Sequence, residues 1–125
     1  MALKLLIVDD SDHVRLELSE VLTAAGYTVV QAVDGKDGLN QAMAHDDIAL
    51  ILTDFNMPGL DGLSMLAKIR ELGGPKGAVP TVVLTTERTS ELKSAGKALG
   101  VKAWIIKPFV ASSLLKMVAV VLSQP

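Results

Sequence analysis

Short runs of apolar residues recur five times along the chain and alternate with longer stretches that mix apolar and polar residues. The first, third, fourth and fifth runs are almost entirely apolar, which is typical of parallel strands covered on both faces. The second run is less apolar, so we expect it to lie toward an edge of the sheet. The expected strands are Lys4–Val8, Thr28–Gln31, Ile48–Thr53, Val79–Thr85 and Ala103–Ile106.

The mixed stretches space their apolar residues as helices with one buried face do. In the first stretch these residues are Val14, Leu18, Val21, Leu22 and Ala25, before a natural stop at Gly26. Further helices are expected over about 36–44 (Leu39, Ala42 and Met43 inward), from Gly62 to before Gly73–Gly74–Pro75, over Ser90–Leu99, and after Phe109 (stripe Leu114, Met117, Val118, Val121 and Leu122). This alternation predicts one α/β domain with a five-stranded, doubly wound parallel sheet between two helical layers.

Polar side chains follow the apolar runs at the strand ends, where ligands bind in such sheets. These side chains are Asp9, Asp10, Asp54, Thr85 and Lys107. If the first, third, fourth and fifth strands are neighbours, three carboxylates, a hydroxyl and an ammonium share one pocket. Carboxylates that lie so close repel one another. Mg²⁺ relieves such repulsion through oxygen ligands and bridges to phosphoryl groups.

Each of these residues also has an ordinary structural interpretation. Asp9–Asp10 alone fits a helix cap as well as a metal ligand, and Asp12 is expected to be a cap. Lys107 alone is typical of a solvated charge, and Thr85 alone of a hydroxyl paired with backbone. The joint pattern favours the site, because the strand interiors carry almost no polar chemistry. His13 and His45 have no partner pattern and are expected on the surface.

Composition narrows the classes of function. The net charge of −2 argues against general electrostatic binding to nucleic acid, which needs a basic surface. The chain has no cysteine, so thiolate chemistry and disulfides are excluded. The apolar run near Met1 is too short for a transmembrane helix and lacks the layout of a signal peptide. We therefore expect a cytoplasmic protein without membrane insertion.

Four stretches of the sequence together resemble the receiver domain of two-component response regulators, and within that family the stand-alone, CheY-like chemotaxis regulators. The stretches are Asp9–Asp10–Ser11 with Arg15 following, Asp54–Phe55–Asn56–Met57–Pro58–Gly59–Leu60–Asp61–Gly62, Val83–Leu84–Thr85–Thr86–Glu87, and Trp104–Ile105–Ile106–Lys107–Pro108–Phe109. They run in the family's order over essentially the whole chain. The resemblance implies one receiver domain over 1–125 with no output domain, a flavodoxin-like (βα)5 fold and strand order 2-1-3-4-5.

The resemblance also implies a role for each residue at the strand ends. Asp54 would accept a phosphoryl group from a histidine kinase or a histidine phosphotransfer protein. The implied Mg²⁺ ligands are Asp10, Asp54, the backbone carbonyl of Asn56 and, mainly through water, Asp9. The implied partners of the phosphoryl oxygens are Lys107 and Thr85, the implied switch residues are Thr85 and Trp104, and Lys107–Pro108 is a candidate cis peptide.

Two residues depart from the family pattern. Thr86 stands where the family usually has Ala or Gly, and its β-branched side chain is expected to narrow access to the site. Trp104 stands where the family usually has Tyr or Phe. The two alternatives for Trp104 are therefore an inward flip of the aromatic ring and a fixed, half-exposed indole.

Three classes of function fit this sequence to different degrees. A signalling switch is favoured, and the protein is expected not to be an enzyme beyond assisting its own phosphorylation and dephosphorylation. An aspartyl-nucleophile phosphatase needs a second carboxylate two residues after the nucleophile, where this chain has Asn56. A structural receiver-like domain is disfavoured because the acidic set, Thr85 and Lys107 are all present.

The expected output is docking to a target protein by a monomer or weak dimer, and the resemblance suggests chemotaxis as one such pathway. The expected docking face combines the helix Ser90–Leu99, the fifth strand and the last helix. Leu115, Ala119 and Val120 lie off the buried stripe of that last helix, where a solvated helix normally carries charge. The chain either acts alone or is one domain of a longer protein.

Overall fold

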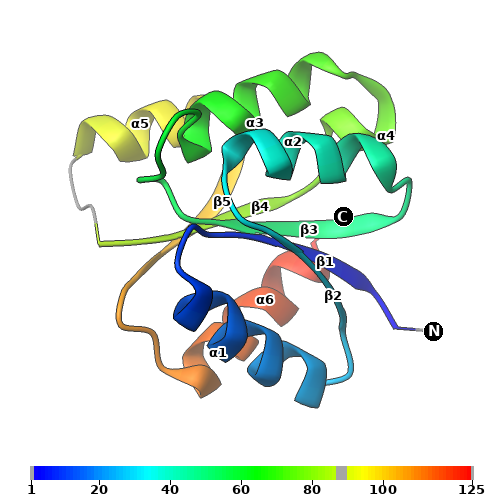
Figure 1. Cartoon of the computed structure of the whole chain (residues 1–125), viewed down its shortest axis with the longest axis vertical. Helices are drawn as coiled ribbons and strands as arrows, with labels where there is room; N and C mark the ends of the chain where they lie inside the picture. Colours follow the sequence, from blue (N-terminus) through cyan, green and yellow to red (C-terminus); the bar gives the residue numbers. More distant parts are fainter. Residues whose placement is uncertain (1, 87–89, 125) are drawn as a thin grey trace.

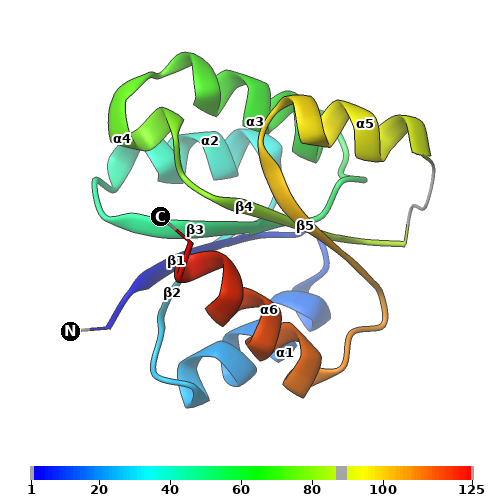
Figure 2. The ribbon, with the colours of Figure 1, turned by 180° about the vertical axis from the view of Figure 1, so that it is seen from behind.

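The computed structural model describes residues 2–86 and 90–124, which form a five-stranded parallel sheet between two layers of helices (Figures 1 and 2). The strand order is β2-β1-β3-β4-β5, as the family resemblance implied. Helices α1 and α6 cover one face, and α2, α3, α4 and α5 cover the other. The elements in chain order are β1 (Lys4–Val8), α1 (Asp12–Ala24), β2 (Thr28–Ala32), α2 (Gly35–Ala44), β3 (Ile48–Thr53), α3 (Gly62–Glu71), α4 (Gly74–Gly77), β4 (Thr81–Thr85), α5 (Ser90–Ala98), β5 (Val101–Ile106) and α6 (Ala111–Leu122).

All five expected strands are present, and β1 and β3 have the expected bounds. Strand β4 begins at Thr81 rather than Val79. Pro80 precedes it and has no N–H to donate to the ladder, although its carbonyl accepts a hydrogen bond from Ile51 N at 2.9 Å. Strand β5 begins at Val101, two residues earlier than expected, because Val101 pairs with Thr81.

The expected helices are also present, with three corrections of detail. Asp12 is not the cap of α1: the hydroxyl of Ser11 accepts from Val14 N, and Asp12 is the first helical residue. Met43 does not face inward but is 43% exposed, whereas Ala42 of the same helix is buried. The short helix α4 was not expected, and it begins beside Gly73–Gly74–Pro75, where the sequence indicated only the end of a helix.

Two hydrophobic cores lie on opposite faces of the sheet, because successive strand residues point to opposite sides. In β1, Leu5 and Ile7 enter the core under α1 and α6, and Leu6 and Val8 enter the core under α2 and α3. The expected stripe of α6 is confirmed: Leu114, Val118 and Val121 are buried, and Met117 and Leu122 pack against the first core. No helix within the described ranges is long and apolar enough to cross a membrane.

The indole of Trp104 packs against α5 at Gly96, which is the buried residue of that helix. A Cβ atom on Gly96 would lie 2.8 Å from Cζ2 of Trp104. We predict that Gly96→Ala lowers the free energy of unfolding by roughly 1–2 kcal/mol, because overpacking outweighs the gain in helix propensity. In a Trp104→Phe background the loss should be smaller, because the closest contact of the new Cβ atom is removed while the one with Cγ2 of Val101, at 3.2 Å, remains. Urea denaturation of the four proteins measures the coupling, and equal losses in both backgrounds would contradict it.

Candidate functional site

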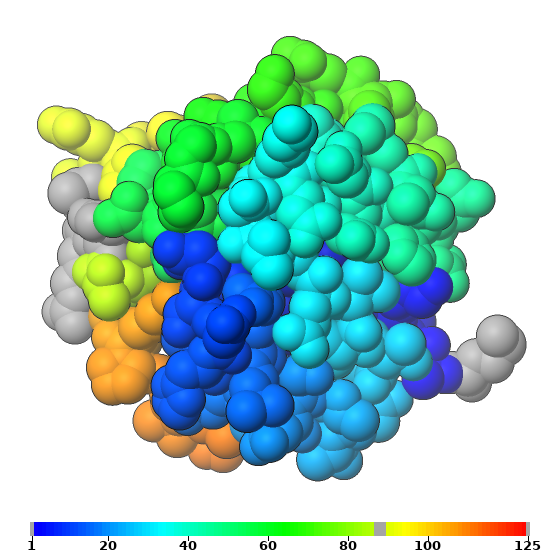
Figure 3. Space-filling model, in the orientation of Figure 1, coloured from blue at the N-terminus to red at the C-terminus, as the bar shows by residue number. Residues whose placement is uncertain are grey.

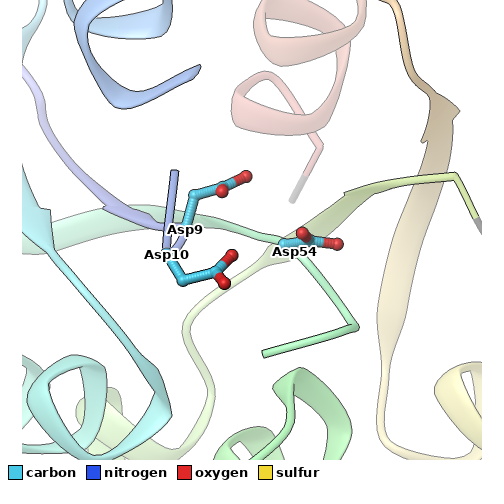
Figure 4. Close-up of side chains that lie close together, drawn as sticks. All are labelled: Asp9, Asp10 and Asp54. Carbon is cyan, nitrogen blue, oxygen red and sulfur yellow. The ribbon is translucent and has the colours of Figure 1, made fainter. Parts of the chain in front are cut away.

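Three carboxylates meet at the carboxyl ends of the neighbouring strands β1 and β3. Val8 pairs with Thr53 in the parallel ladder, so Asp9 and Asp54 follow aligned strand ends. Asp9, Asp10 and Asp54 each offer a carboxylate oxygen, and these oxygens lie within 4.8 Å of one another (Figure 4). The adjacency of β1 and β3 therefore brings the three expected residues together.

Asp54 is held firmly at this edge of the sheet and is only 8% exposed. Its amide donates to Val8 O at 2.9 Å, and its carboxylate accepts from Asn56 N at 3.2 Å. Helix α3 begins very close to it: a Cβ atom on Gly62 would lie 2.3 Å from the carbonyl oxygen of Asp54. Gly62 is thus required for this close approach of helix and loop.

Lys107 reaches the acidic cluster from the end of β5. Its Nζ lies 2.8 Å from Oδ2 of Asp9 and 3.0 Å from Oδ2 of Asp54. Burial alone would lower the pKa of Lys107, but its hydrogen bonds to Asp9 and Asp54 outweigh burial and raise that pKa above its usual value. The ammonium is therefore positively charged at neutral pH and lies between two buried carboxylates. The Lys107–Pro108 peptide bond is cis, as the resemblance implied.

Thr85 completes the expected set at the same edge. It ends β4, it is fully buried, and its ladder partner is Ile106, the residue before Lys107. The following Thr86 is exposed. Glu87, the last residue of the stretch Val83–Leu84–Thr85–Thr86–Glu87, lies outside the described residues.

The donor set at this edge fits a hard divalent cation. All three clustered side chains offer oxygen, the ligand type that Mg²⁺ and Ca²⁺ prefer. Asp10 is exposed, and its carboxylate accepts no hydrogen bond from residues 2–86 and 90–124. Asp9 and Asp54 each use one oxygen for Lys107, and their other oxygens accept single backbone hydrogen bonds from Ser11 and Asn56.

A groove of about 390 Å³ opens beside Lys107, between α1 and the segment that joins β5 to α6. It is lined by His13, Val14, Glu17, Thr86, Lys107, Pro108 and Phe109.

His13 is exposed, as expected. His45 is not a plain surface residue: it is half-buried, and its Nδ1 lies 3.4 Å from the Nζ of Lys4.

Arg15 is the residue near the site that sequence reasoning missed, since it was quoted only as part of a motif. It is 8% exposed, and its Nη1 donates to the carbonyl oxygen of Asp9 at 2.5 Å. Its Nη2 pairs with the carboxylate of Asp12. A signal was present, because Arg15 lies at helical spacing from Leu18 and Leu22, the two other buried residues of α1. A cation on an apolar stripe indicates a buried partner.

Residues 5–119 match the model of the response regulator receiver domain family. The chain is 36% identical over 122 residues to chemotaxis protein CheY1 of Helicobacter pylori, covering 96% of this chain and 97% of that protein. It superposes on the structure of chemotaxis protein CheY4 of Vibrio cholerae with a TM-score of 0.90 and 36% identity, covering 97% of this chain and 99% of that one. It also resembles a CheX–CheY–BeF3–Mg²⁺ complex from Borrelia burgdorferi, with a TM-score of 0.90, 25% identity and coverage of 98% and 90%.

Other curated relatives are much longer than this chain. The chain is 34% identical to the sensory/regulatory protein RpfC of Xanthomonas campestris and spans 16% of its length. It is also 34% identical to the transcriptional regulatory protein PrrA of Mycobacterium tuberculosis and spans 50% of its length. The shared region therefore occurs both by itself and as part of larger proteins.

Proposed function

This chain belongs to the response regulator receiver domain family, and we propose that it is a phosphoryl-accepting switch of two-component signalling with Asp54 as the acceptor. The observation that carries this proposal is the placement of the Asp54 carboxylate, beside two other carboxylates and 3.0 Å from Lys107 Nζ. A nucleophilic carboxylate needs nearby positive charge, because phosphoryl oxygens are negative and would otherwise be repelled.

We propose that a carboxylate oxygen of Asp54 attacks the phosphorus of a phosphohistidine in the donor protein. The new O–P bond replaces the P–N bond, which leaves an acyl phosphate on Asp54 and returns the electron pair to the imidazole. Lys107 then pairs with a phosphoryl oxygen as a compact point charge. The hydroxyl of Thr85 donates to a second phosphoryl oxygen, which draws the end of β4 toward the site.

We also propose that Asp9, Asp10, Asp54 and the backbone carbonyl of Asn56 hold Mg²⁺, with Asp9 acting mainly through water. When bound, the ion supplies positive charge that offsets the charge on the phosphoryl oxygens. The presence of Mg²⁺ and a beryllofluoride group in the related Borrelia burgdorferi complex supports this choice of cation.

We propose that the chain is not an enzyme that turns over small phosphoesters. Asn56 lies two residues after Asp54, where an aspartyl-nucleophile phosphatase carries its acidic residue, and an amide cannot donate and recover a proton at neutral pH. The expected activity is limited to the chain's own phosphorylation and its loss.

Incubation with acetyl phosphate and Mg²⁺, followed by intact-mass measurement, tests this function. We expect one phosphoryl group per chain, no incorporation when EDTA removes the cation, and slow loss after the donor is withdrawn. Sustained release of phosphate from a small phosphoester, far in excess of protein, would contradict the proposal and favour a phosphatase.

Receiver domains bind kinases or phosphotransfer proteins and also downstream targets, and we propose that the target of this chain docks on the face formed by α5, β5 and α6. Helix α6 carries a single charged residue, Lys116, and it exposes 48% of Val120. Leu115, which the sequence suggested for the same surface, is half-buried and packs against the core. Val120 is therefore the better probe of this face.

We predict that Val120→Glu weakens the phosphorylation-dependent affinity for the target, or phosphorylation-dependent self-association, by about tenfold, equivalent to about 1.4 kcal/mol. Phosphorylation of Asp54 should be unchanged. The matched control is Leu16→Glu, which changes an apolar residue of α1 that is 57% exposed. Binding assays or ultracentrifugation with and without beryllofluoride measure the effect. If only Leu16→Glu interferes, the docking surface lies on α1 instead.

A further inference from the structure

Two groups of Asp9, its carboxylate and its backbone carbonyl, are held separately in the turn between β1 and α1. The carboxylate of Asp9 is held by Ser11 N at 2.9 Å and by Lys107 Nζ at 2.8 Å. The backbone carbonyl of Asp9 is held separately, by Nη1 of Arg15 at 2.5 Å. This carbonyl belongs to the peptide group that joins Asp9 to Asp10, so Arg15 sets the orientation of that peptide plane.

The direction of the Asp10 side chain depends on this peptide plane. Asp10 is exposed, and within the described ranges no donor holds its carboxylate. Its Cα–Cβ direction is therefore set by the backbone on either side. Even so, its carboxylate points toward Asp9 and Asp54 rather than away from them (Figure 4).

We propose that Arg15 is a positioning residue for divalent-cation binding: it clamps the Asp9–Asp10 peptide so that the Asp10 carboxylate faces the other two acids. The proposal rests on the proposed function in one respect, that the cation binds at these three carboxylates. Arg15 suits this role because the residue is only 8% exposed, so burial restricts the positions that its guanidinium can adopt. In the space-filling view the α1 segment, in blue, lies at the surface of the molecule (Figure 3).

The charge of Arg15 and its hydrogen bond predict opposite changes in cation affinity when Arg15 is replaced. A buried positive charge near the site repels a cation, so if charge were all that mattered, removing Arg15 would tighten cation binding. If Arg15 positions Asp10, removing it leaves the Asp10 carboxylate free to point elsewhere, and cation binding weakens. The sign of the change in affinity separates the two effects.

The experiment is calorimetric titration of the unphosphorylated protein with MgCl2. Substitution of groups that orient metal ligands typically costs ten- to a hundredfold in affinity, and for Arg15→Met we expect about a tenfold rise in Kd for Mg²⁺. Arg15→Lys keeps the charge and one donor, so its Kd for Mg²⁺ should lie between those of wild type and Arg15→Met. The matched control is Asp12→Asn, which leaves the hydrogen bond from Arg15 to the carbonyl of Asp9 in place. Its Kd for Mg²⁺ should be within about twofold of the wild-type value.

A second readout separates positioning from general damage. In Arg15→Met, the Mg²⁺ concentration needed for half-maximal phosphorylation should rise about tenfold, in line with its Kd, while the rate at saturating Mg²⁺ stays close to wild type. Circular dichroism checks that each unphosphorylated variant is folded. If Arg15→Met does not fold, the comparison of Arg15→Lys with Asp12→Asn provides the test. Only Arg15→Lys should then bind Mg²⁺ more weakly than wild type.

Arg15→Met or Arg15→Lys binding Mg²⁺ as tightly as wild type, or more tightly, overturns the positioning role. Failure of wild-type protein to bind Mg²⁺ at all overturns the proposed cation site itself, and the inference with it. The two failures are distinguished by the wild-type titration alone.

Discussion

Replacing Asp54 by Asn is expected to abolish phosphoryl incorporation from acetyl phosphate. The substitution replaces one carboxylate oxygen of a buried side chain by an NH2 group and keeps the size of the side chain. The close approach of Gly62 to the backbone carbonyl of Asp54 is therefore retained. An amide is not a nucleophile toward phosphorus under these conditions, and the loss of one negative charge leaves Lys107 paired with Asp9 alone. Intact-mass measurement should find no phosphorylated chain after an incubation that saturates wild-type protein.

Asp61→Asn is the matched control for this experiment. Asp61 lies in the same loop and caps α3 by accepting from Ser64 N at 2.8 Å, a role that Asn fills equally well. This variant should be phosphorylated to the wild-type level. Normal stoichiometry in Asp54→Asn would show that another residue is the acceptor, and peptide mapping would then identify it.

Replacing Lys107 by Met is expected to lower the free energy of unfolding by about 3 kcal/mol at neutral pH, the lower end of the range for breaking a buried ion pair. The substitution leaves the carboxylates of Asp9 and Asp54 facing each other without the ammonium between them. Urea denaturation in the absence of divalent cations measures the loss. Lys102→Met, an exposed position on the same strand, is the control and should change stability by less than about 0.5 kcal/mol.

The pH dependence of this difference follows from the raised pKa of Lys107. A group whose pKa is higher in the folded protein stabilises the fold fully below its unfolded pKa, which is 10.5 for lysine. The gap between wild type and Lys107→Met should therefore stay constant from pH 7 up to that value and shrink at higher pH. A gap that instead shrinks between pH 7 and pH 9 would show that Lys107 is not the group responsible.

The residues of the site were predictable from the sequence because of where they stand along the chain. Asp9, Asp54 and Lys107 each follow directly after an apolar run, and in a parallel sheet such positions lie at one edge whatever the strand order. The tertiary structure supplied the adjacency of β1 to β3 and the reach of Lys107 across to both acids.

Burial on the helices was predicted less well. Met43 has the helical spacing of an inward residue but is 43% exposed, and Leu115 lies off the buried stripe of α6 yet packs against the core. Spacing defines a face of a helix, whereas the rotation and tilt of that helix on the sheet decide which edge of the face is covered. Those two quantities depend on neighbouring elements that are distant in sequence.

The sequence alone therefore determined the strands, the main helices and the chemistry at the strand ends, because apolar periodicity and strand-end polarity are local properties of the chain. The tertiary structure alone decided two further features. One is the close contact between the indole of Trp104 and Gly96, and the other is the hydrogen bond from Arg15 to the carbonyl of Asp9. Both depend on side chains meeting atoms of another element, and the spacing of residues along one chain does not specify such meetings.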